Sequence, residues 1–256
     1  MGSFRVMQFN MQFGQVWDDA DPDHAPLNLD LAIGEIRRQD ADIVILQEVE
    51  QARAGVIQTE PPPNYGRLQA ALPGYDSYFA YPKLDPRELP FGIGLAIFSK
   101  TPLRGRMRRD LPSPPVEFQF GGKTMTPTDR LLIGASTTVQ GRELHVFDVH
   151  LLAFFMLKSS SEQHLGQREM VIDSLRASSG ATLLGGDFNV SNHASLLSQF
   201  GAAGFHSVQD KEITWRRRPY VLDHIFHSKE LRPVRHQVLP TPASDHHILV
   251  ADFEFT

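Results

Sequence analysis

Residues 181–189, ATLLGGDFN, combine a short apolar run with a polar ending. The run Ala181 to Gly185 has the length and composition of a strand that is covered on both faces. Asp187 and Asn189 follow it, and strand ends are where a sheet holds polar side chains rigidly in a shared cleft. This stretch therefore predicts a sheet whose strand ends carry the chemistry of the protein.

Five other apolar runs end in the same manner. Phe4 to Phe9 leads to Asn10, and Asp42 to Gln47 (DIVILQ) leads to Glu48. The remaining polar residues at such positions are Asp148 and His150 after Glu143 to Val149, Asp223 and His224 within Tyr220 to Phe226, and Asp245, His246 and His247 before Ile248 to Phe253. Gly94 to Ser99 and Leu131 to Val139 are further strand candidates.

Helical periodicity is confined to a few segments. Leu29, Ile33 and Ile36 recur at helical spacing, and helices are also expected at Ser161 to Arg176 and at Ala194 to Phe200, the latter capped by Asn192. Strands of the second half follow one another without helices between them, which argues against a purely doubly wound sheet. We therefore expect an α/β (α+β) fold: a four-layer α/β/β/α sandwich of two packed mixed sheets with helices outside.

The chain as a whole reads as one domain, residues 1–256. The proline-rich stretches Thr59 to Asn64 and Leu111 to Pro115 are expected loops and are too short for interdomain linkers. The 256 residues hold no cysteine, which excludes disulfides and thiolate metal sites. No export signal or bilayer-length apolar run is recognisable, so the expected location is cytoplasmic. The net charge of −5 disfavours binding of long duplex by charge alone.

Each polar strand end has an ordinary structural explanation as a turn residue or a satisfied core group. Their number and chemistry favour a shared site instead. Carboxylate and amide oxygens suit Mg²⁺ or Mn²⁺, a second carboxylate can activate water, and histidines can neutralise phosphoryl oxygens. The chain contains neither HExxH nor GxSxG, so a zinc peptidase and an α/β-hydrolase have no support. The inventory predicts a metal-dependent phosphoester hydrolase.

The ordered motifs FNMQF, ILQE, DVHL, GDFN, LDHIF and SDHH, residues 9–247, resemble the endonuclease/exonuclease/phosphatase (DNase I-like) superfamily. The resemblance implies that Glu48 is the principal metal carboxylate, assisted by Asn10 and Asp245. It implies catalytic roles for five further residues: Asp187 and Asn189 for the water and phosphate, His246 oriented and charged by Asp223, and His150. Whether Asp187 or His246 takes the proton of the water stays open.

Three positions depart from relatives in an informative way. His150 stands where abasic-site endonucleases of the superfamily carry tyrosine, so DVHL is similar to the NTHL or SHL motif of sphingomyelinases, inositol polyphosphate phosphatases, RNA deadenylases and tyrosyl-DNA phosphodiesterases. Asp148 adds a negative charge that alters metal or phosphate affinity only if it faces the cleft. Gln12, where some nucleases have an acid, fits a single-metal site better than a two-metal one.

The substrate class is indicated by local features. Trp215 with Arg216, Arg217 and Arg218 is interpreted as a rim that stacks a base and binds phosphates, with a buried tryptophan in a solvated turn as the alternative. This favours a single-stranded or frayed nucleic-acid end. The apolar run Leu151 to Leu157 (LLAFFML) is expected in the core, and as a membrane-touching loop it would favour a sphingomyelinase-like enzyme. An inositol-phosphate phosphoesterase and a catalytically silent binding module are the remaining alternatives. A third local feature is a group of arginines that are expected to face solvent: Arg104, Arg106, Arg108 and Arg109.

Overall fold

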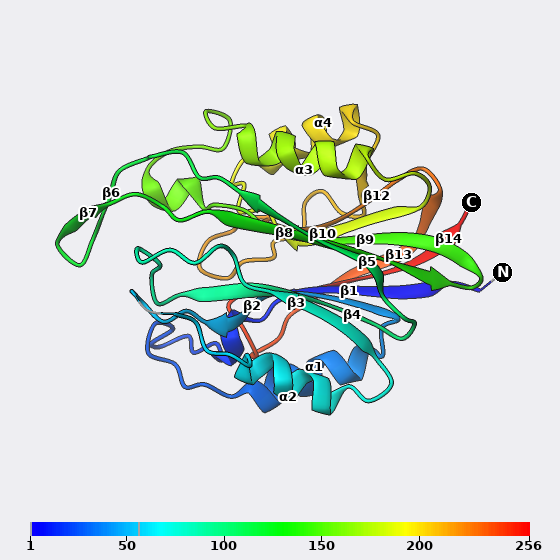
Figure 1. Ribbon diagram of the computed structural model, residues 1–256, viewed down its shortest axis with the longest axis horizontal. Helices are drawn as coiled ribbons and strands as arrows, with labels where there is room; N and C mark the ends of the chain where they lie inside the picture. Colours follow the sequence, from blue (N-terminus) through cyan, green and yellow to red (C-terminus); the bar gives the residue numbers. More distant parts are fainter. Residues whose placement is uncertain (1, 56) are drawn as a thin grey trace.

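Two six-stranded sheets pack face to face in the computed structural model, which describes residues 2–55 and 57–256. Helices α1 and α2 cover the outer face of one sheet, and α3 and α4 cover the outer face of the other (Figure 1). The order of layers is therefore helix, sheet, sheet, helix, and the predicted four-layer sandwich is confirmed.

The first sheet has the strand order β13-β14-β1-β2-β4-β3. Its only parallel pair among the described residues is β1–β2, and the other neighbours are antiparallel. The strands are β1 (Phe4–Asn10), β2 (Ile43–Gln51), β3 (Asp76–Ala80), β4 (Gly92–Ser99), β13 (Leu231–Leu239) and β14 (Ile248–Phe255).

The second sheet repeats this plan with the order β11-β12-β10-β9-β8-β5. Here β9–β10 is the parallel pair, again near the centre of the sheet. The strands are β5 (Arg104–Leu111), β8 (Arg130–Val139), β9 (Arg142–His150), β10 (Thr182–Asp187), β11 (His206–Ser207) and β12 (Asp223–His227). Both sheets are thus mixed, as expected from the scarcity of helical crossovers.

The helices and one small hairpin complete the molecule. The helices are α1 (Leu29–Gln39), α2 (Pro63–Ala71), α3 (Gly166–Arg176) and α4 (His193–Ala202), with 3₁₀ turns η1 (Gln12–Gly14) and η2 (Phe154–Leu157). The hairpin of β6 (Phe118–Phe120) and β7 (Lys123–Met125) projects from the left end of the sandwich (Figure 1). Among the described helices, none is long and apolar enough to cross a membrane.

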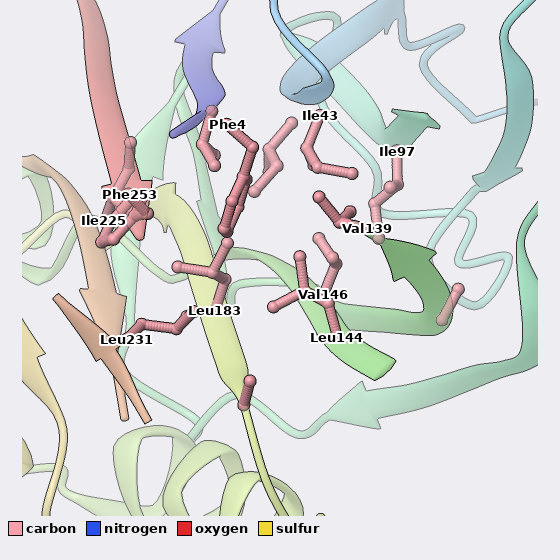
Figure 2. Close-up of a cluster of buried hydrophobic side chains, with 14 of the residues drawn as sticks. Phe4, Ile43, Ile97, Val139, Leu144, Val146, Leu183, Ile225, Leu231 and Phe253 are labelled. Carbon is pink, nitrogen blue, oxygen red and sulfur yellow. The ribbon is translucent and has the colours of Figure 1, made fainter. Parts of the chain in front are cut away.

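Alternation along the strands builds the core between the sheets. Phe4 and Val6 of β1 and Ile43 and Ile45 of β2 meet residues such as Leu183 of β10 in one buried cluster (Figure 2). The intervening residues face outward, where they pack under the helices. Because side chains alternate with a period of two, each central strand contributes to both an inner and an outer core.

Several expected elements have different limits in the structure. The proline-rich stretch from Thr59 is not loop throughout, because α2 begins at Pro63, which proline tolerates at a first helical turn. Strand β12 begins at Asp223 and not at Tyr220. The arginine cluster from Arg104 lies in the edge strand β5. Asn192 does occupy the N-cap of α4, but its side chain makes no capping hydrogen bond.

Candidate active site

The two central parallel pairs bring the polar strand ends together. Asn10 is the last residue of β1, and its neighbour in β2 is Gln47. In the other sheet His150 ends β9 and pairs with Asp187, which ends β10. The second sheet therefore presents His150 and Asp187 side by side at one edge. Asn10 of the first sheet lies opposite them, with its amide nitrogen 3.1 Å from Asp187 Oδ2.

The inner face of each central strand changes from apolar to polar as it approaches this point. In β1 the inward series is Phe4, Val6, Gln8 and Asn10, and the last two are completely buried. In β9 the series Leu144 and Val146 continues to Asp148 and His150. The apolar parts hold the sheets together, and the same rigid backbone delivers the polar residues to the cleft.

Glu48 reaches the site in a different way from the one expected. It does not end β2, which continues to Gln51. Strand alternation would point Glu48 away from the cleft, because its neighbour Gln47 already points inward. Glu48 instead adopts a left-handed backbone (φ 50°) at a register shift between Gln47 and Glu50. This bulge turns two consecutive side chains to the inner face, a use of bulges that is common beside active sites.

Gly92 of β4 makes room for the carboxylate of Glu48. A Cβ atom at Gly92 would lie 1.9 Å from Oε2 and 2.3 Å from Cβ of Glu48. Any side chain there would displace Glu48, so this glycine is required by close approach and not by its own backbone angle.

A compact polar cluster surrounds Asn10. Its Nδ2 donates to Glu48 Oε1 and to Asp187 Oδ2, each at 3.1 Å. His150 Nε2 lies 3.8 Å from the same oxygen of Glu48 and 3.6 Å from that of Asp187. Glu48, His150 and Asp187 each offer a ligand atom within 4.8 Å of the others. Two carboxylates and an imidazole are a donor set that can hold a divalent cation such as Mg²⁺ or Mn²⁺. Asn10 turns its NH₂ group toward these carboxylates, while its Oδ1 accepts the backbone N–H of Gln12.

Asp187 also belongs to a second group of three, with Asp223 and His246. His246 Nδ1 bonds Asp223 Oδ2 at 2.8 Å, and His246 Nε2 lies 3.6 Å from Asp187 Oδ2. Asp223 and Asp187 are almost completely buried, and His246 is 5% exposed. The predicted hydrogen bond between Asp223 and His246 is therefore confirmed, and one Asp187 oxygen faces two imidazoles.

Burial and charge shift the titration of these groups. Burial, together with Asp223 and Glu48, raises the pKa of Asp187 to about 8. Burial by itself would lower the pKa of His246, but the carboxylates of Asp223 and Asp187 outweigh it and raise that pKa well above its usual value. The pKa of His150 is held well below its usual value by burial and by the positive charges of Arg130 and His246. The two histidines are thus differentiated, with His246 charged and His150 neutral.

The other predicted site residues are Asn189 and Asp245. Their hydrogen-bond donors bind groups within the chain. Asn189 donates its backbone N–H to Asp187 Oδ1 at 3.0 Å and its side-chain amide to the carbonyl of Leu151 at 3.1 Å. Asp245 donates its backbone N–H to Gln12 Oε1 at 3.2 Å. Asp245 is not in either ligand group of the described residues. Its role as a metal ligand stays a prediction, as does that of Asn189 toward phosphate.

The prediction that Trp215 to Arg218 form a substrate-binding rim is wrong for Trp215, Arg216 and Arg217. Trp215 is only 8% exposed, and its indole N–H donates to Asp245 Oδ2. Arg217 binds the same oxygen at 2.7 Å and also forms an ion pair with the exposed Asp23, in the loop before α1. Arg216 donates to the carbonyl of Thr241. The aromatic face is packed and two guanidiniums are engaged within the chain, so only Arg218 is exposed without a partner among the described residues.

Arg130 is a candidate that the sequence analysis missed. It begins β8, beside His150 of β9, and it influences the titration of both Glu48 and His150. Its Nε is buried without a hydrogen-bond partner among the described residues. In sequence it is a lone arginine before an apolar run, and no local signal separates it from a solvated one.

Two further expectations concern the surface. Leu151, Leu152 and Phe154 are buried, as expected for a core segment, although Met156 in the same run is 58% exposed. The arginines of β5 are exposed except for Arg109, which binds α3 through the carbonyl of Met170 and the hydroxyl of Ser174. Neither segment contributes a side chain to the polar cluster.

Comparison with solved structures supports the fold. An endonuclease/exonuclease/phosphatase from Beutenbergia cavernae is 21% identical, with a TM-score of 0.73 over 100% of this chain and 72% of that one. The human nocturnin catalytic domain, with bound sulfate, is 22% identical, with a TM-score of 0.67 over 99% and 95%. The Bacteroides thetaiotaomicron mannosyl-6-phosphatase Bt3783 is 17% identical, with a TM-score of 0.69 over 99% and 100%.

Sequence comparison is more specific. No curated protein matches the chain. The profile of the Endonuclease/Exonuclease/phosphatase family, however, matches residues 7–246, a range that contains every strand end of the cluster. With that match over nearly the whole chain and the two-sheet sandwich built around the six motifs, the protein belongs to the Endonuclease/Exonuclease/phosphatase family.

Proposed function

We propose that this protein is a divalent-metal-dependent phosphoester hydrolase that uses Mg²⁺ or Mn²⁺ and acts as one domain. The observation that carries the proposal is the convergence of Asn10, Glu48, His150, Asp187 and His246 within hydrogen-bond or ion-pair distance of one another. A protein that had kept the fold only for binding would have no need to gather this many ionisable groups in a buried cluster.

Glu48 and Asn10 are the residues proposed to hold the cation, with Asp245 as a further ligand. A bound divalent cation supplies Lewis-acid stabilisation of charge on the phosphoryl oxygens. Asn10 bridges Glu48 Oε1 and Asp187 Oδ2, so it also fixes the spacing of the two carboxylates. Glu48 is 18% exposed at its side chain, which leaves this ligand accessible from the cleft.

Asp187 is proposed to orient the attacking water and to take its proton. Burial raises its pKa above that of an exposed aspartate, which makes the carboxylate a stronger base. His246 is held in its charged form by Asp223, so it is suited to stabilise negative charge and not to accept a proton. Water adds to phosphorus as Asp187 takes its proton, and the bond from phosphorus to the leaving oxygen breaks. That oxygen departs as an alcohol with a proton from solvent, to which Asp187 returns the proton that it took. Asn189 keeps Asp187 in place through its backbone N–H.

For the substrate we propose a nucleic-acid phosphodiester at a single-stranded or frayed end. With Trp215 packed inside, such an end would be held by its phosphates and not by stacking. Arg218, exposed at the surface, and Arg130, with its unpartnered Nε, are the cations suited to this contact. The neutral imidazole of His150, shared with the NTHL-type relatives, would donate to a phosphoryl oxygen. A lipid or sugar phosphate needs none of these outer contacts.

The hydrolase proposal is tested with bis-p-nitrophenyl phosphate after removal of metal by EDTA. We expect no turnover without metal and recovery when Mg²⁺ or Mn²⁺ is added back. Asp187→Asn should abolish the recovered activity, whereas Asp173→Asn on the surface of α3 should not. Turnover that EDTA leaves unchanged, or that survives Asp187→Asn, would contradict the proposal.

The substrate is tested with a panel of oligonucleotide ends, sphingomyelin, phosphoinositides and sugar phosphates under Mg²⁺. Arg218→Met should raise KM for an oligonucleotide more than for the small diester, because Arg218 is exposed outside the polar cluster and only the longer substrate has flanking phosphates. Arg104→Met is the control, since Arg104 is exposed on β5 and outside the cluster. Faster cleavage of a lipid or a sugar phosphate than of every oligonucleotide would refute the nucleic-acid assignment.

A further inference from the structure

Four polar side chains form a hydrogen-bonded chain between the two sheets, behind the polar cluster. Gln8 and Gln47 belong to the first sheet, and Asp148 and Asp223 belong to the second. Each has 0% exposure, and the inner layer around them is otherwise built of aliphatic and aromatic residues. Polar groups in such a place destabilise the fold unless they are satisfied, so their presence calls for a specific reason.

The chain is continuous from Asp148 to the histidine of the cluster. Gln47 Nε2 donates to Asp148 Oδ1 at 2.7 Å, and Gln8 Nε2 donates to Gln47 Oε1 at 2.7 Å. Gln8 Nε2 also donates to Asp223 Oδ1 at 2.9 Å, and the other oxygen of Asp223 binds His246 Nδ1. Both cross-sheet bonds therefore lie on the path that ends at His246.

Hydrogen bonding fixes the orientation of the side-chain amides of Gln47 and Gln8. Gln47 turns its NH₂ group toward Oδ1 of Asp148 and its carbonyl toward Gln8. That carbonyl in turn draws the NH₂ group of Gln8, whose second hydrogen reaches Asp223. If Gln8 were reversed, its carbonyl oxygen would face a carboxylate oxygen. Asp148, acting through Gln47, and Asp223 thus favour the same orientation of the Gln8 amide.

The chain also leaves groups unsatisfied. Asp148 Oδ2 and Gln8 Oε1 are buried with no partner among the described residues, and burial raises the pKa of Asp148 well above its usual value. Apolar residues of similar volume would fill these positions without that cost. A buried polar group without a partner calls for a specific explanation.

We propose that Asp148, Gln47 and Gln8 are a positioning relay that holds Asp223, and through it His246, in the orientation required for phosphoester hydrolysis. The inference rests on the proposed function, and none of the three residues touches the substrate. Asp148 lies two residues before His150 in β9 and is buried between the two sheets. It therefore acts on the site from inside the sandwich and not from the cleft.

The test separates the acceptor of Asp148 from its charge. Asp148→Asn keeps an oxygen for Gln47 and places its NH₂ where no partner stands now, so kcat should stay within a factor of about two of wild type. Asp148→Leu removes the acceptor, and kcat should fall by about tenfold or more, with KM and the half-saturating metal concentration unchanged. Gln8→Met provides a second break in the relay, with the same expected kcat loss. Thr137→Val is the control, because Thr137 is another buried hydrogen-bonded group of the second sheet, remote from the cluster.

A wild-type kcat in Asp148→Leu and Gln8→Met, or an Asn variant as slow as the Leu variant, would overturn the relay while the hydrolase assignment stands. Absence of metal-dependent turnover in the wild type on every phosphoester would instead overturn the proposed function. In that event crystal structures of wild type and Asp148→Leu still decide the relay. We expect the Asp223–His246 contact to be rearranged in the variant, and an unchanged contact would overturn it.

Discussion

Gly92→Ala is expected to disable the site by moving Glu48. Gly92 does not have a positive φ, so alanine fits the backbone there and the only obstacle is its neighbour. The new methyl would lie 2.3 Å from Cβ of Glu48, which is 1.1 Å shorter than the 3.4 Å at which ordinary van der Waals contact begins. A rotamer change moves the carboxylate but not Cβ, so the bulge itself has to shift by about 1 Å.

A displacement of that size has a known order of effect. Misplacement of a reacting group by about 1 Å can lower a rate by about 100-fold, and overpacking typically destabilises a protein by about 1–3 kcal/mol. We therefore expect kcat/KM for bis-p-nitrophenyl phosphate to fall by about 100-fold, and the Mg²⁺ or Mn²⁺ concentration at half-saturation to rise. Metal titration of turnover, together with binding of Mn²⁺ followed by EPR, measures both.

Gly134→Ala is the matched control. A Cβ atom at Gly134 would lie 2.6 Å from the ring of Phe147 and 3.2 Å from the side chain of Met107, both away from Glu48. It should lower the melting temperature to a similar extent without weakening metal binding. If Gly92→Ala binds metal and turns over substrate like wild type, the close approach of Gly92 does not position Glu48, and the reasoning from the bulge is wrong.

Other consequences of the geometry are equally open to measurement. Asp187→Asn and His246→Ala should each lower kcat by at least about 100-fold with unchanged circular dichroism, and near-normal turnover would remove that residue from the mechanism. Asp223→Asn should lower the pKa of His246, because the hydrogen-bonded carboxylate favours the imidazolium; an unchanged NMR titration would show that the two do not couple. Burial lowers the pKa of His224 to about 4 from 6.5, so the unfolded state takes up the proton first as the pH falls. The free energy of unfolding should then drop by about 3 kcal/mol between pH 6.5 and 4, and urea titrations of His224→Gln should lack this loss.

Much of the fold and part of the site follow from local patterns. Alternation over Phe4 to Phe9 and the apolar run before Asp187 predicted central strands, and the structure contains both. The polar ends Asn10, His150 and Asp187 meet because parallel neighbours end at one edge. This much is accessible from sequence because strand periodicity is a property of a few consecutive residues, and because the ordered motifs identify one family.

Other features depended on partners far away in the chain. The bulge that turns Glu48 inward relies on Gly92 in the neighbouring strand, so a single-strand pattern could only place Glu48 at a strand end. The sequence around Trp215, with three arginines after it, suggested an exposed stacking platform. In the structure its indole N–H instead donates to Asp245, 30 residues later.

The relay through Asp148 and the isolation of Arg130 have the same origin. Asp148 belongs to the relay because it binds Gln47, 101 residues earlier. Arg130 became a candidate because its buried Nε has no hydrogen-bond partner among the described residues. Periodicity and motif order thus determined which residues this protein brings to one end of its two sheets. Burial, hydrogen-bond direction and close packing between strands distant in sequence decided how those residues are held, because these interactions exist only once the two sheets have packed together.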